Sequence, residues 1–321
     1  MSSSREIGGY FELEIKSGSF LHDDLVQLNS GRNCFEYALR LLKPTKVFFP
    51  KFTCDVMIEP LKKLNIEYAL YSIDKNFEII DRPKLKMGEI ILYTNYFGMK
   101  DKYANLLSKL YKDSLVLDCS QAYYFKPLKT GYTFYSPRKF FGVSDGGLLA
   151  SDKLLDQDFE RDVSSGRIEH LTKRLELGAQ AGYSDFRVND GKLSDNPIKR
   201  MSVLTQRILS NIDFDMARKK RRKNAVYLHA KLGSINQLNV DPGAASSLMV
   251  YPFLIDNQSI REYLITNKVF TALYWPNVLE WCKEDELEYY LSKNLLPLPI
   301  DQRYNTDDME YIIKTLREGL E

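Results

Sequence analysis

The sequence predicts an α/β protein with a large domain, built on a mainly parallel central sheet, and a small C-terminal α+β domain. Across residues 1–150, short β-rich runs alternate with helical patterns of about ten residues, which is typical of parallel sheets. The β-rich runs are apolar almost throughout, as expected when helices cover both faces of a sheet. After Asp241-Pro242-Gly243 the pattern starts afresh. We therefore predict the large domain over residues 1–232 and the small domain over 233–321.

The expected elements of the large domain follow in order along the chain. Residues 102–111 have the clearest helical pattern, because their apolar side chains recur at helical spacing and form one stripe. Other helices are expected at 33–42 and 55–64, and strands at 46–49, 66–73, 89–93 and 114–117.

The middle of the chain, residues 152–232, is highly charged and mostly helical in pattern. A polar stretch at 182–196 interrupts it and is predicted to be a loop. The basic run ARKKRRK at 217–223 is interpreted as a solvated helix face. In the small domain we expect a strand at 248–255, a helix at 258–267 and a C-terminal helix at 307–320, with Thr306 as its capping residue and acids in its first turn.

Composition limits the classes of partner. The chain has 321 residues, enough for a large core, with 45 Lys and Arg against 43 Asp and Glu, so the net charge is +2. This balance gives no broad electrostatic reason to expect a nucleic-acid or membrane partner, although a small local anion site stays open. The N-terminus lacks a signal-peptide pattern, and no run approaches the roughly 20 apolar residues of a membrane span. We expect a cytoplasmic protein.

The four cysteines predict neither a metal site nor a disulfide framework. They form no CxxC pair and match no zinc-finger spacing. Four in a chain of this length are too sparse for a disulfide scaffold. We expect reduced thiols at Cys34, Cys54, Cys119 and Cys282.

Two short segments carry residue types suited to binding a charged ligand. Ser30-Gly31-Arg32 precedes an amphipathic helix, where free N–H groups and the positive end of the dipole can bind phosphate. Ser30 could equally be a plain N-cap. An apolar strand then ends in Asp118, with Gln121 three residues later. Ligands of open α/β sheets bind at such strand ends, but Asp118 could also cap a turn.

A third segment, 134–147, places Lys139 among apolar and aromatic residues and ahead of Gly146-Gly147. Burial would lower the pKa of the lysine amine, as a Schiff-base lysine requires. The alternative is a surface lysine beside a Gly-Gly turn, since most lysines are exposed.

In this order the segments resemble the fold type I pyridoxal 5'-phosphate (PLP) enzymes, and more narrowly the DegT/DnrJ/EryC1/StrS family of sugar aminotransferases. That family has a small-residue turn at the first helix, an Asp-x-x-Gln strand end, and a lysine followed by Gly-Gly. The resemblance covers nearly the whole chain and implies an aspartate aminotransferase-like fold. Further segments similar to the family are Pro50-Lys51-Phe52-Thr53, Tyr96-Phe97-Gly98 and Leu298-Pro299.

The chain departs from the family pattern at two site positions, and it is shorter than typical members. The family usually has a serine five residues before the lysine, where this chain has Phe134. Either Ser136 replaces that serine or the loop runs differently. Where the family often has an aromatic residue stacked on the cofactor ring, the chain has Cys54, with Phe52 nearby.

The resemblance implies a role for each matching residue. Lys139 would form the Schiff base with PLP and act as general base, Asp118 would pair with the pyridine nitrogen, and Gln121 would bind near the ring hydroxyl. Phe52 or Cys54 would lie on a face of the ring. The phosphate would be held by Ser30, Gly31, Arg32 and Ser136.

The family's two-subunit sites imply a homodimer with shared active sites. The stretch 182–196, with Arg187 and Asn189, either reaches a partner's cofactor or is a mobile surface loop. Arg303 either binds the carboxylate of the amino donor or pairs with Asp301 or Glu310.

The expected function is transfer of an amino group from an amino acid, glutamate first among them, to a nucleotide-linked keto sugar in surface polysaccharide or lipopolysaccharide synthesis. The alternative is a PLP-fold protein with another reaction type, such as sugar dehydration, or a non-catalytic binding or regulatory module. In the related dehydratases a histidine replaces the lysine, so Lys139 favours transamination. A Rossmann-type dehydrogenase is less well supported, because no GxGxxG follows the first strand.

The sequence is rich in Tyr and Phe, with 21 and 17 residues, but it has only 2 Trp. Most are expected to fill the core. Others lie in or beside the segments assigned to the site, where they would form a wall for the flat cofactor ring and a sugar face. Tyr10 is among these and is predicted to contact the substrate.

Overall fold

A seven-stranded sheet forms the centre of the structure, a computed structural model that describes residues 7–243 and 245–321. The strand order is β1-β7-β6-β5-β4-β2-β3. The β2, β3, β4, β5 and β6 strands pair in parallel, whereas β7 is antiparallel to both β6 and β1. The predicted, mainly parallel α/β sheet is therefore confirmed. The bounds are β1 Val26–Leu28, β2 Lys46–Pro50, β3 Glu67–Tyr71, β4 Glu89–Thr94, β5 Leu115–Asp118, β6 Tyr132–Tyr135 and β7 Gly147–Ala150.

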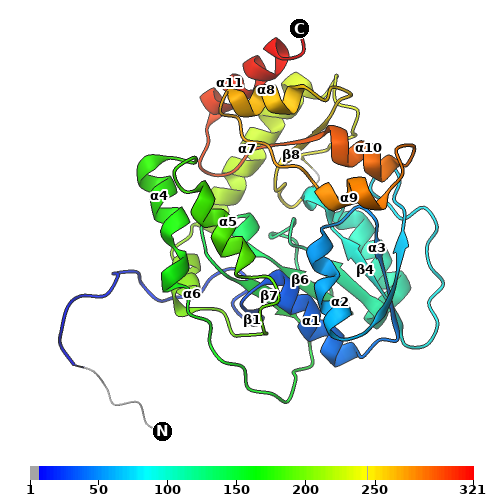
Figure 1. The fold of residues 1–321 in the computed structure, drawn as a ribbon, viewed down its shortest axis with the longest axis vertical. Coiled ribbons are helices and arrows are strands. Elements are labelled where there is room, and N and C mark those ends of the chain that lie inside the picture. Colours follow the sequence, from blue (N-terminus) through cyan, green and yellow to red (C-terminus); the bar gives the residue numbers. More distant parts are fainter. Residues whose placement is uncertain (1–6, 244) are drawn as a thin grey trace.

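Both faces of the central strands β4 and β5 are buried, which explains why these strands are almost wholly apolar. Successive side chains of a strand point to opposite faces. Along β4, Ile90 and Leu92 belong to one core cluster, whereas Ile91 and Tyr93 belong to the other. The first face packs against α1 (Gly31–Leu42) and α2 (Glu59–Lys63), and α3 (Asp101–Tyr111) lies on the second. Figure 1 shows this layered arrangement in the lower part of the molecule.

The middle of the chain is mostly helical, with α4 Glu169–Leu177, α5 Tyr183–Gly191, α6 Val203–Ser210 and α7 Phe214–Leu232. The prediction of a loop at 182–196 is wrong, because α5 occupies most of it. The α5 helix packs against α4, through an ion pair of 2.8 Å between Lys173 Nζ and Asp185 Oδ2 and a ring contact between His170 and Phe186. These contacts stabilise a helix in a sequence of weak helix formers.

The C-terminal elements gather at one end of the molecule (Figure 1). A two-stranded antiparallel sheet of β8 (Tyr251–Leu254) and β9 (Leu295–Leu298) is surrounded by α8 (Ile260–Thr266), α9 (Pro276–Trp281), α10 (Leu287–Asn294) and α11 (Thr306–Glu318). The N-cap of α11 is Asn305, one residue before the expected Thr306, and it forms a capping box with Asp308. The α7 helix contacts α11 and β8. The division at residue 232 stays a prediction.

Among the described residues, no helix is both long and apolar enough to cross a membrane.

Candidate functional site

The predicted site segments meet at one edge of the sheet. The β2, β4, β5 and β6 strands run in the same direction, and β1 shares it because two antiparallel pairings separate β1 from β6. The carboxyl ends of all five therefore lie on one side. In open α/β sheets this is the edge at which ligands bind.

Ser30 and Gly31 connect β1 to α1 in a tightly packed turn. Ser30 is the N-cap, and its Oγ accepts a hydrogen bond of 3.1 Å from the N–H of Asn33. The N–H of Gly146, at a φ of 124°, donates to the carbonyl of Asn29 at 2.7 Å. A side chain at Gly147 would overlap the carbonyl oxygen of Ser30. The Gly-Gly pair thus lets the start of β7 lie against the turn.

Gly31 faces two serines from other strand ends. A Cβ at this position would lie 3.4 Å from Ser120 Oγ and 3.5 Å from Ser136 Cβ. The helix start, the turn after β5 and the end of β6 thus form one small cradle, which has hydroxyl groups and the free N–H groups of the first turn of α1. Such a cradle suits a phosphate. Ser120 was not among the residues predicted from the sequence, although its place within the Asp-x-x-Gln strand end could have pointed to it.

Arg32 does not direct its guanidinium to this cradle. Its Nη1 donates to the carbonyl of Leu193 at 2.7 Å and lies 2.8 Å from Glu59 Oε2. The side chain therefore joins α1 to α2 and to the segment after α5. Only the main chain of Arg32 belongs to the cradle.

Asp118 ends β5 as a buried carboxylate. Its Oδ1 accepts a hydrogen bond of 2.7 Å from the N–H of Ser120. Burial raises the pKa of Asp118, while the hydrogen bonds from Ser120 and the positive charge of Lys139 act in the opposite direction. An acid in this setting would be stabilised as a carboxylate by a bound cation.

Lys139 lies in a short turn, Pro137–Lys139, that follows β6. Of the two alternatives, a buried lysine and a surface lysine beside a Gly-Gly turn, the structure shows the second, because the side chain is exposed. The neighbouring aromatic residues Phe140 and Phe141 are buried instead. The charge of Lys139 acts on Asp118 and Cys54, and its Nζ lies 6.0 Å from the centre of the Tyr274 ring.

Tyr274 is a site residue that the sequence analysis missed. It belongs to the segment between α8 and α9, and its ring stacks on Phe97 with 6.0 Å between centroids. Burial raises the pKa of Tyr274, and the charge of Lys139 lowers it. The adjoining Trp275, one of two tryptophans in the chain, marks this segment in the sequence, but nothing there connects it to Lys139.

Gln121 holds the turn that follows β4. Its Oε1 accepts a hydrogen bond of 2.8 Å from the N–H of Phe97, which leaves the NH2 group of the amide as a donor. Phe97 has a φ of 54°, in the left-handed region, which costs free energy for a residue with a side chain. The hydrogen bond from Gln121 helps to stabilise that conformation.

Phe52 and Cys54 follow β2 but face different surroundings. Phe52 is fully buried and packs with Phe77, Tyr96 and Trp275, so it is a core residue. Cys54 is half-buried, and its pKa is raised by burial and lowered by the charge of Lys139. Of the two, Cys54 is therefore the one placed beside the lysine.

Other predicted residues lie apart from this cluster. Tyr10 is 98% exposed on an N-terminal segment that leaves the body of the molecule (Figure 1). Arg303 makes a two-point ion pair with Asp301, at 2.7 and 2.8 Å. This is the ion pair that was predicted as the alternative to binding the donor carboxylate. Asn189 donates from Nδ2 to the carbonyl of Ser144 in its own chain at 2.9 Å, and Arg187 is exposed on α5.

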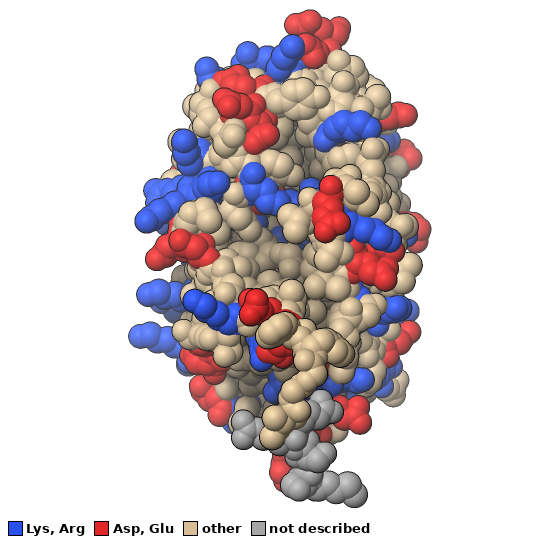
Figure 2. Space-filling view, turned by 90° about the vertical axis from the view of Figure 1, so that its left-hand side faces the viewer, with Lys and Arg blue, Asp and Glu red and all other residues tan. Residues whose placement is uncertain are grey.

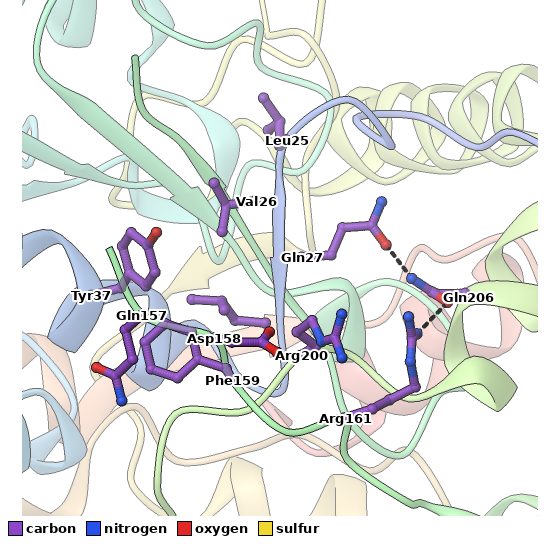
Figure 3. Close-up of a pocket in the computed structure, with 11 residues that line it drawn as sticks. Leu25, Val26, Gln27, Tyr37, Gln157, Asp158, Phe159, Arg161, Arg200 and Gln206 are labelled. Carbon is purple, nitrogen blue, oxygen red and sulfur yellow. Dashed lines mark hydrogen bonds between the residues drawn. The ribbon is translucent and has the colours of Figure 1, made fainter. Parts of the chain in front are cut away.

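A pocket of about 310 Å³ lies beside the edge strand β1. Figure 3 shows Arg161, Gln206 and Gln27 linked in a row by hydrogen bonds, with Tyr37 and Phe159 on the other side. None of the residues around Lys139 lines this pocket.

On the face shown in Figure 2, acidic and basic side chains alternate around a central hollow that is lined mainly by uncharged residues.

No protein-family model and no curated protein matches the chain. Solved structures do match it over almost its whole length. An aminotransferase of the DegT/DnrJ/EryC1/StrS type from Brucella abortus has a TM-score of 0.62 and 14% identity, covering 92% of this chain and 85% of its own. A sugar aminotransferase from Micromonospora echinospora has a TM-score of 0.60 and 15% identity, covering 92% and 87%.

A third similar structure comes from a Streptococcus pneumoniae protein with a provisional sugar aminotransferase assignment. Its apo form has a TM-score of 0.66 and 13% identity, covering 96% of this chain and 92% of its own. The same protein has been solved in PLP and pyridoxamine phosphate (PMP) forms. The chain thus has the fold of the DegT/DnrJ/EryC1/StrS aminotransferases, as its sequence predicted.

Proposed function

We propose that this protein is a PLP-dependent aminotransferase. The observation that carries the proposal is the convergence of Lys139, Asp118 and the Gly31–Ser120–Ser136 cradle at the carboxyl edge of the sheet. A lysine amine, a buried acid and a phosphate cradle are the three groups that PLP requires from a protein. The PLP and PMP forms of the similar Streptococcus pneumoniae structure support the same cofactor.

The residues present fit this cofactor. Gly31 leaves the cradle open, where the Cβ of any other residue would face Ser120 and Ser136. The donors there are hydroxyls and N–H groups, which bind phosphate oxygens well. Asp118 is a buried acceptor suited to a protonated ring nitrogen, and the NH2 group of Gln121 is a donor suited to the ring hydroxyl oxygen.

When bound, PLP supplies an electron sink that stabilises negative charge at the carbon bearing the amino group. Lys139 would hold the cofactor covalently at rest and, once released, carry the proton between that carbon and the cofactor. Asp118 would keep the ring nitrogen protonated. Tyr274 and Phe97 would exclude water from one side of Lys139, since their rings pack together there.

For the substrates, we propose an amino-acid donor, with glutamate first, and a nucleotide-linked keto sugar as acceptor in surface polysaccharide or lipopolysaccharide synthesis. The amino acid would become a keto acid, and the keto sugar an amino sugar, so that amino group and carbonyl oxygen exchange places. The printed description of the Micromonospora echinospora protein as a sugar aminotransferase supports a sugar acceptor. Arg303 is not part of this proposal, because Asp301 occupies its guanidinium. We keep the cytoplasm as the predicted location.

We further propose a homodimer with shared active sites. The N-terminal segment exposes Ile7, Tyr10 and Phe11, at 88, 98 and 92%, and leaves the body of its own chain (Figure 1). Apolar side chains presented in this way are suited to burial against a second copy. Light scattering should therefore give twice the chain mass, and deletion of residues 1–11 should shift the mass toward the monomer. A full-length protein that stays monomeric would contradict this proposal.

The cofactor is tested on purified protein. Added PLP should give the visible absorbance of a C=N bond, and borohydride followed by peptide mapping should place the cofactor on Lys139. A Lys139→Ala variant should lose the signal, whereas Lys129→Ala, at an exposed position, should keep it. L-Glutamate should then convert the cofactor to PMP, and a keto sugar should restore PLP. A wild-type protein that binds no PLP would refute the proposal, and keto-sugar conversion without amino transfer would favour dehydration.

A further inference from the structure

Arg221 is a buried cation in a run that the sequence analysis interpreted as solvated. It lies on α7, where Lys219, Lys220 and Arg222 are exposed as expected. Arg221 itself is only 2% exposed, so the interpretation is wrong at this position. Burying a guanidinium is costly unless its donors are all used. Its partners therefore indicate what it does.

The guanidinium joins three segments that are far apart in the chain. Its Nη2 donates to the carbonyl of Phe140 at 3.1 Å, its Nη1 to the carbonyl of Met249 at 2.9 Å, and its Nε to Gln302 Oε1 at 2.9 Å. Gln302 in turn donates from Nε2 to the same Phe140 carbonyl at 3.0 Å. The Phe140 ring lies 4.6 Å from Arg221 Cζ.

No acid makes an ion pair with Arg221 in the part of the chain that the structure describes. Burial lowers the pKa of Arg221 to about 10, and the charge of Asp301, which is itself bound to Arg303, only partly offsets this effect. The donors of Arg221 are thus directed at main-chain carbonyls and at one amide. Such an arrangement fixes the positions of peptides rather than neutralising a charge.

One of those peptides joins Phe140 to Phe141 and so lies one residue after Lys139. We propose that Arg221, together with Gln302, is a positioning residue for Lys139, holding the Phe140 carbonyl so that the lysine amine faces the site. This inference rests on the proposed PLP function and extends it to two residues outside the site.

A second connection reaches the other wall of the site. The N–H of Met249, whose carbonyl Arg221 binds, donates to the carbonyl of Phe97 at 2.9 Å. The N–H of Phe97 donates to Gln121 Oε1. Arg221 therefore connects the turn at Pro137–Lys139 to the turn that contains Phe97. Through Gln302, the segment after β9 is joined to the same two turns. Loosening this connection should change the reach of Lys139 more than it changes the phosphate cradle, which Arg221 does not contact.

The test compares two ligands that share a phosphate and a ring. PLP condenses with the Lys139 amine, forming a C=N bond and releasing water, whereas PMP forms no bond to the lysine. We expect Arg221→Lys and Gln302→Met to weaken PLP binding about tenfold, the equivalent of one charged hydrogen bond, and to leave PMP affinity within about twofold. The pH dependence of the C=N absorbance should shift in both variants.

The matched control is Arg222→Met, which removes the next arginine of the same helix, an exposed one bound to the carbonyl of Gly243 at 3.2 Å. It should leave both affinities unchanged. In a Lys139→Ala background, the Gln302→Met effect on PLP should disappear. Equal loss of PLP and PMP affinity, or no loss in Gln302→Met, would overturn the proposal. Gln302→Met decides the matter should Arg221→Lys fail to fold. Failure of the proposed function would appear separately, as a wild-type protein without a C=N bond.

Discussion

Asp118 combines a buried position with a proposed role, pairing with a protonated ring nitrogen, that requires negative charge. Burial raises its pKa, so the native protein takes up the proton more readily than the unfolded chain does. Asp118 therefore contributes most to stability below its ordinary pKa of about 3.9, and that contribution is lost as the pH rises through the raised native value. A bound pyridinium would offset this cost.

Replacing Asp118 by Asn should separate stability from function. The amide stays neutral and can still accept the hydrogen bond from the N–H of Ser120, so the apo variant should be more stable than wild type at neutral pH and lose this advantage at low pH. Its transamination rate should fall about 10- to 100-fold, the equivalent of one charged hydrogen bond. Urea unfolding across pH, together with steady-state kinetics, tests both effects. Equal stability of variant and wild type at every pH would contradict the argument.

Tyr274 offers a ring and a hydroxyl beside Lys139, and two variants distinguish them. Tyr274→Phe keeps the ring that packs on Phe97, so it should lower kcat less than about tenfold. Tyr274→Leu removes the ring and with it a cation–π contact of about 0.5–1 kcal/mol, so it should lower kcat further. Steady-state kinetics measures the two effects. An equal loss in Tyr274→Phe and Tyr274→Leu would mean that the hydroxyl, which both variants lack, matters and the ring does not.

At the scale of elements, Gly31, at the start of α1, and Gly147, which packs against the turn before it, should respond differently to replacement by alanine. Gly31→Ala places its Cβ at ordinary contact distances and favours the helix, so stability should stay within about 1 kcal/mol while affinity for PLP and for inorganic phosphate falls. Gly147→Ala would overlap the Ser30 carbonyl oxygen and approach Cys34 Sγ at 2.7 Å, which should cost about 1–3 kcal/mol or more. Thermal unfolding and phosphate titration separate the two. Similar destabilisation in both variants would contradict this contrast.

The elements that the sequence predicted are those with a strong local pattern. The β2, β4 and β5 strands are apolar runs covered on both faces, and α3 has one continuous apolar stripe. In contrast, β1 has only three residues, and β9 contains Pro297, which argues against a strand. The α5 helix depends on its contacts with α4 rather than on its own residues. Tertiary packing defines these elements, so their local sequence could not.

The same limit applies to the candidate site. Asp118, Gln121 and Lys139 could be selected because each follows a strand end in a recognisable order. Tyr274 and Arg221 could not, since the fold alone brings α7 and the segment before α9 next to the lysine turn. The sequence left the burial of Lys139 open, because its aromatic neighbours Phe140 and Phe141 are turned into the core while the lysine itself is exposed.

For the whole molecule, the C-terminal elements are fixed to the loops of the central sheet by contacts close to the site. Asn277 Nδ2 donates to the carbonyl of Thr53 at 2.9 Å, and Trp275 packs edge-on against Phe52 with 4.9 Å between centroids. Glu288, on α10, accepts a hydrogen bond of 2.8 Å from the N–H of Ile73. Tyr274 lies directly before Trp275 and α9 in the chain. Contacts that fix Trp275 and α9 to the sheet loops therefore also keep Tyr274 beside Lys139.

Variants of Glu288 test how much the contact between α10 and the segment after β3 contributes to stability and to PLP binding. Both partners of its hydrogen bond are buried, with Glu288 2% and Ile73 0% exposed, so water cannot replace a lost acceptor. Glu288→Ala should therefore lower the free energy of unfolding by about 1–3 kcal/mol, whereas Glu288→Gln keeps an oxygen acceptor and should cost less than about 1 kcal/mol. Glu284→Ala, at an exposed position nearby, is the control and should change nothing. Because the docking positions Tyr274, Glu288→Ala should also weaken PLP binding more than Glu288→Gln does. Urea unfolding measures the stability and PLP titration the affinity. If Glu288→Ala lowered the stability but not the PLP affinity, the contact of α10 with the sheet would not be what positions Tyr274.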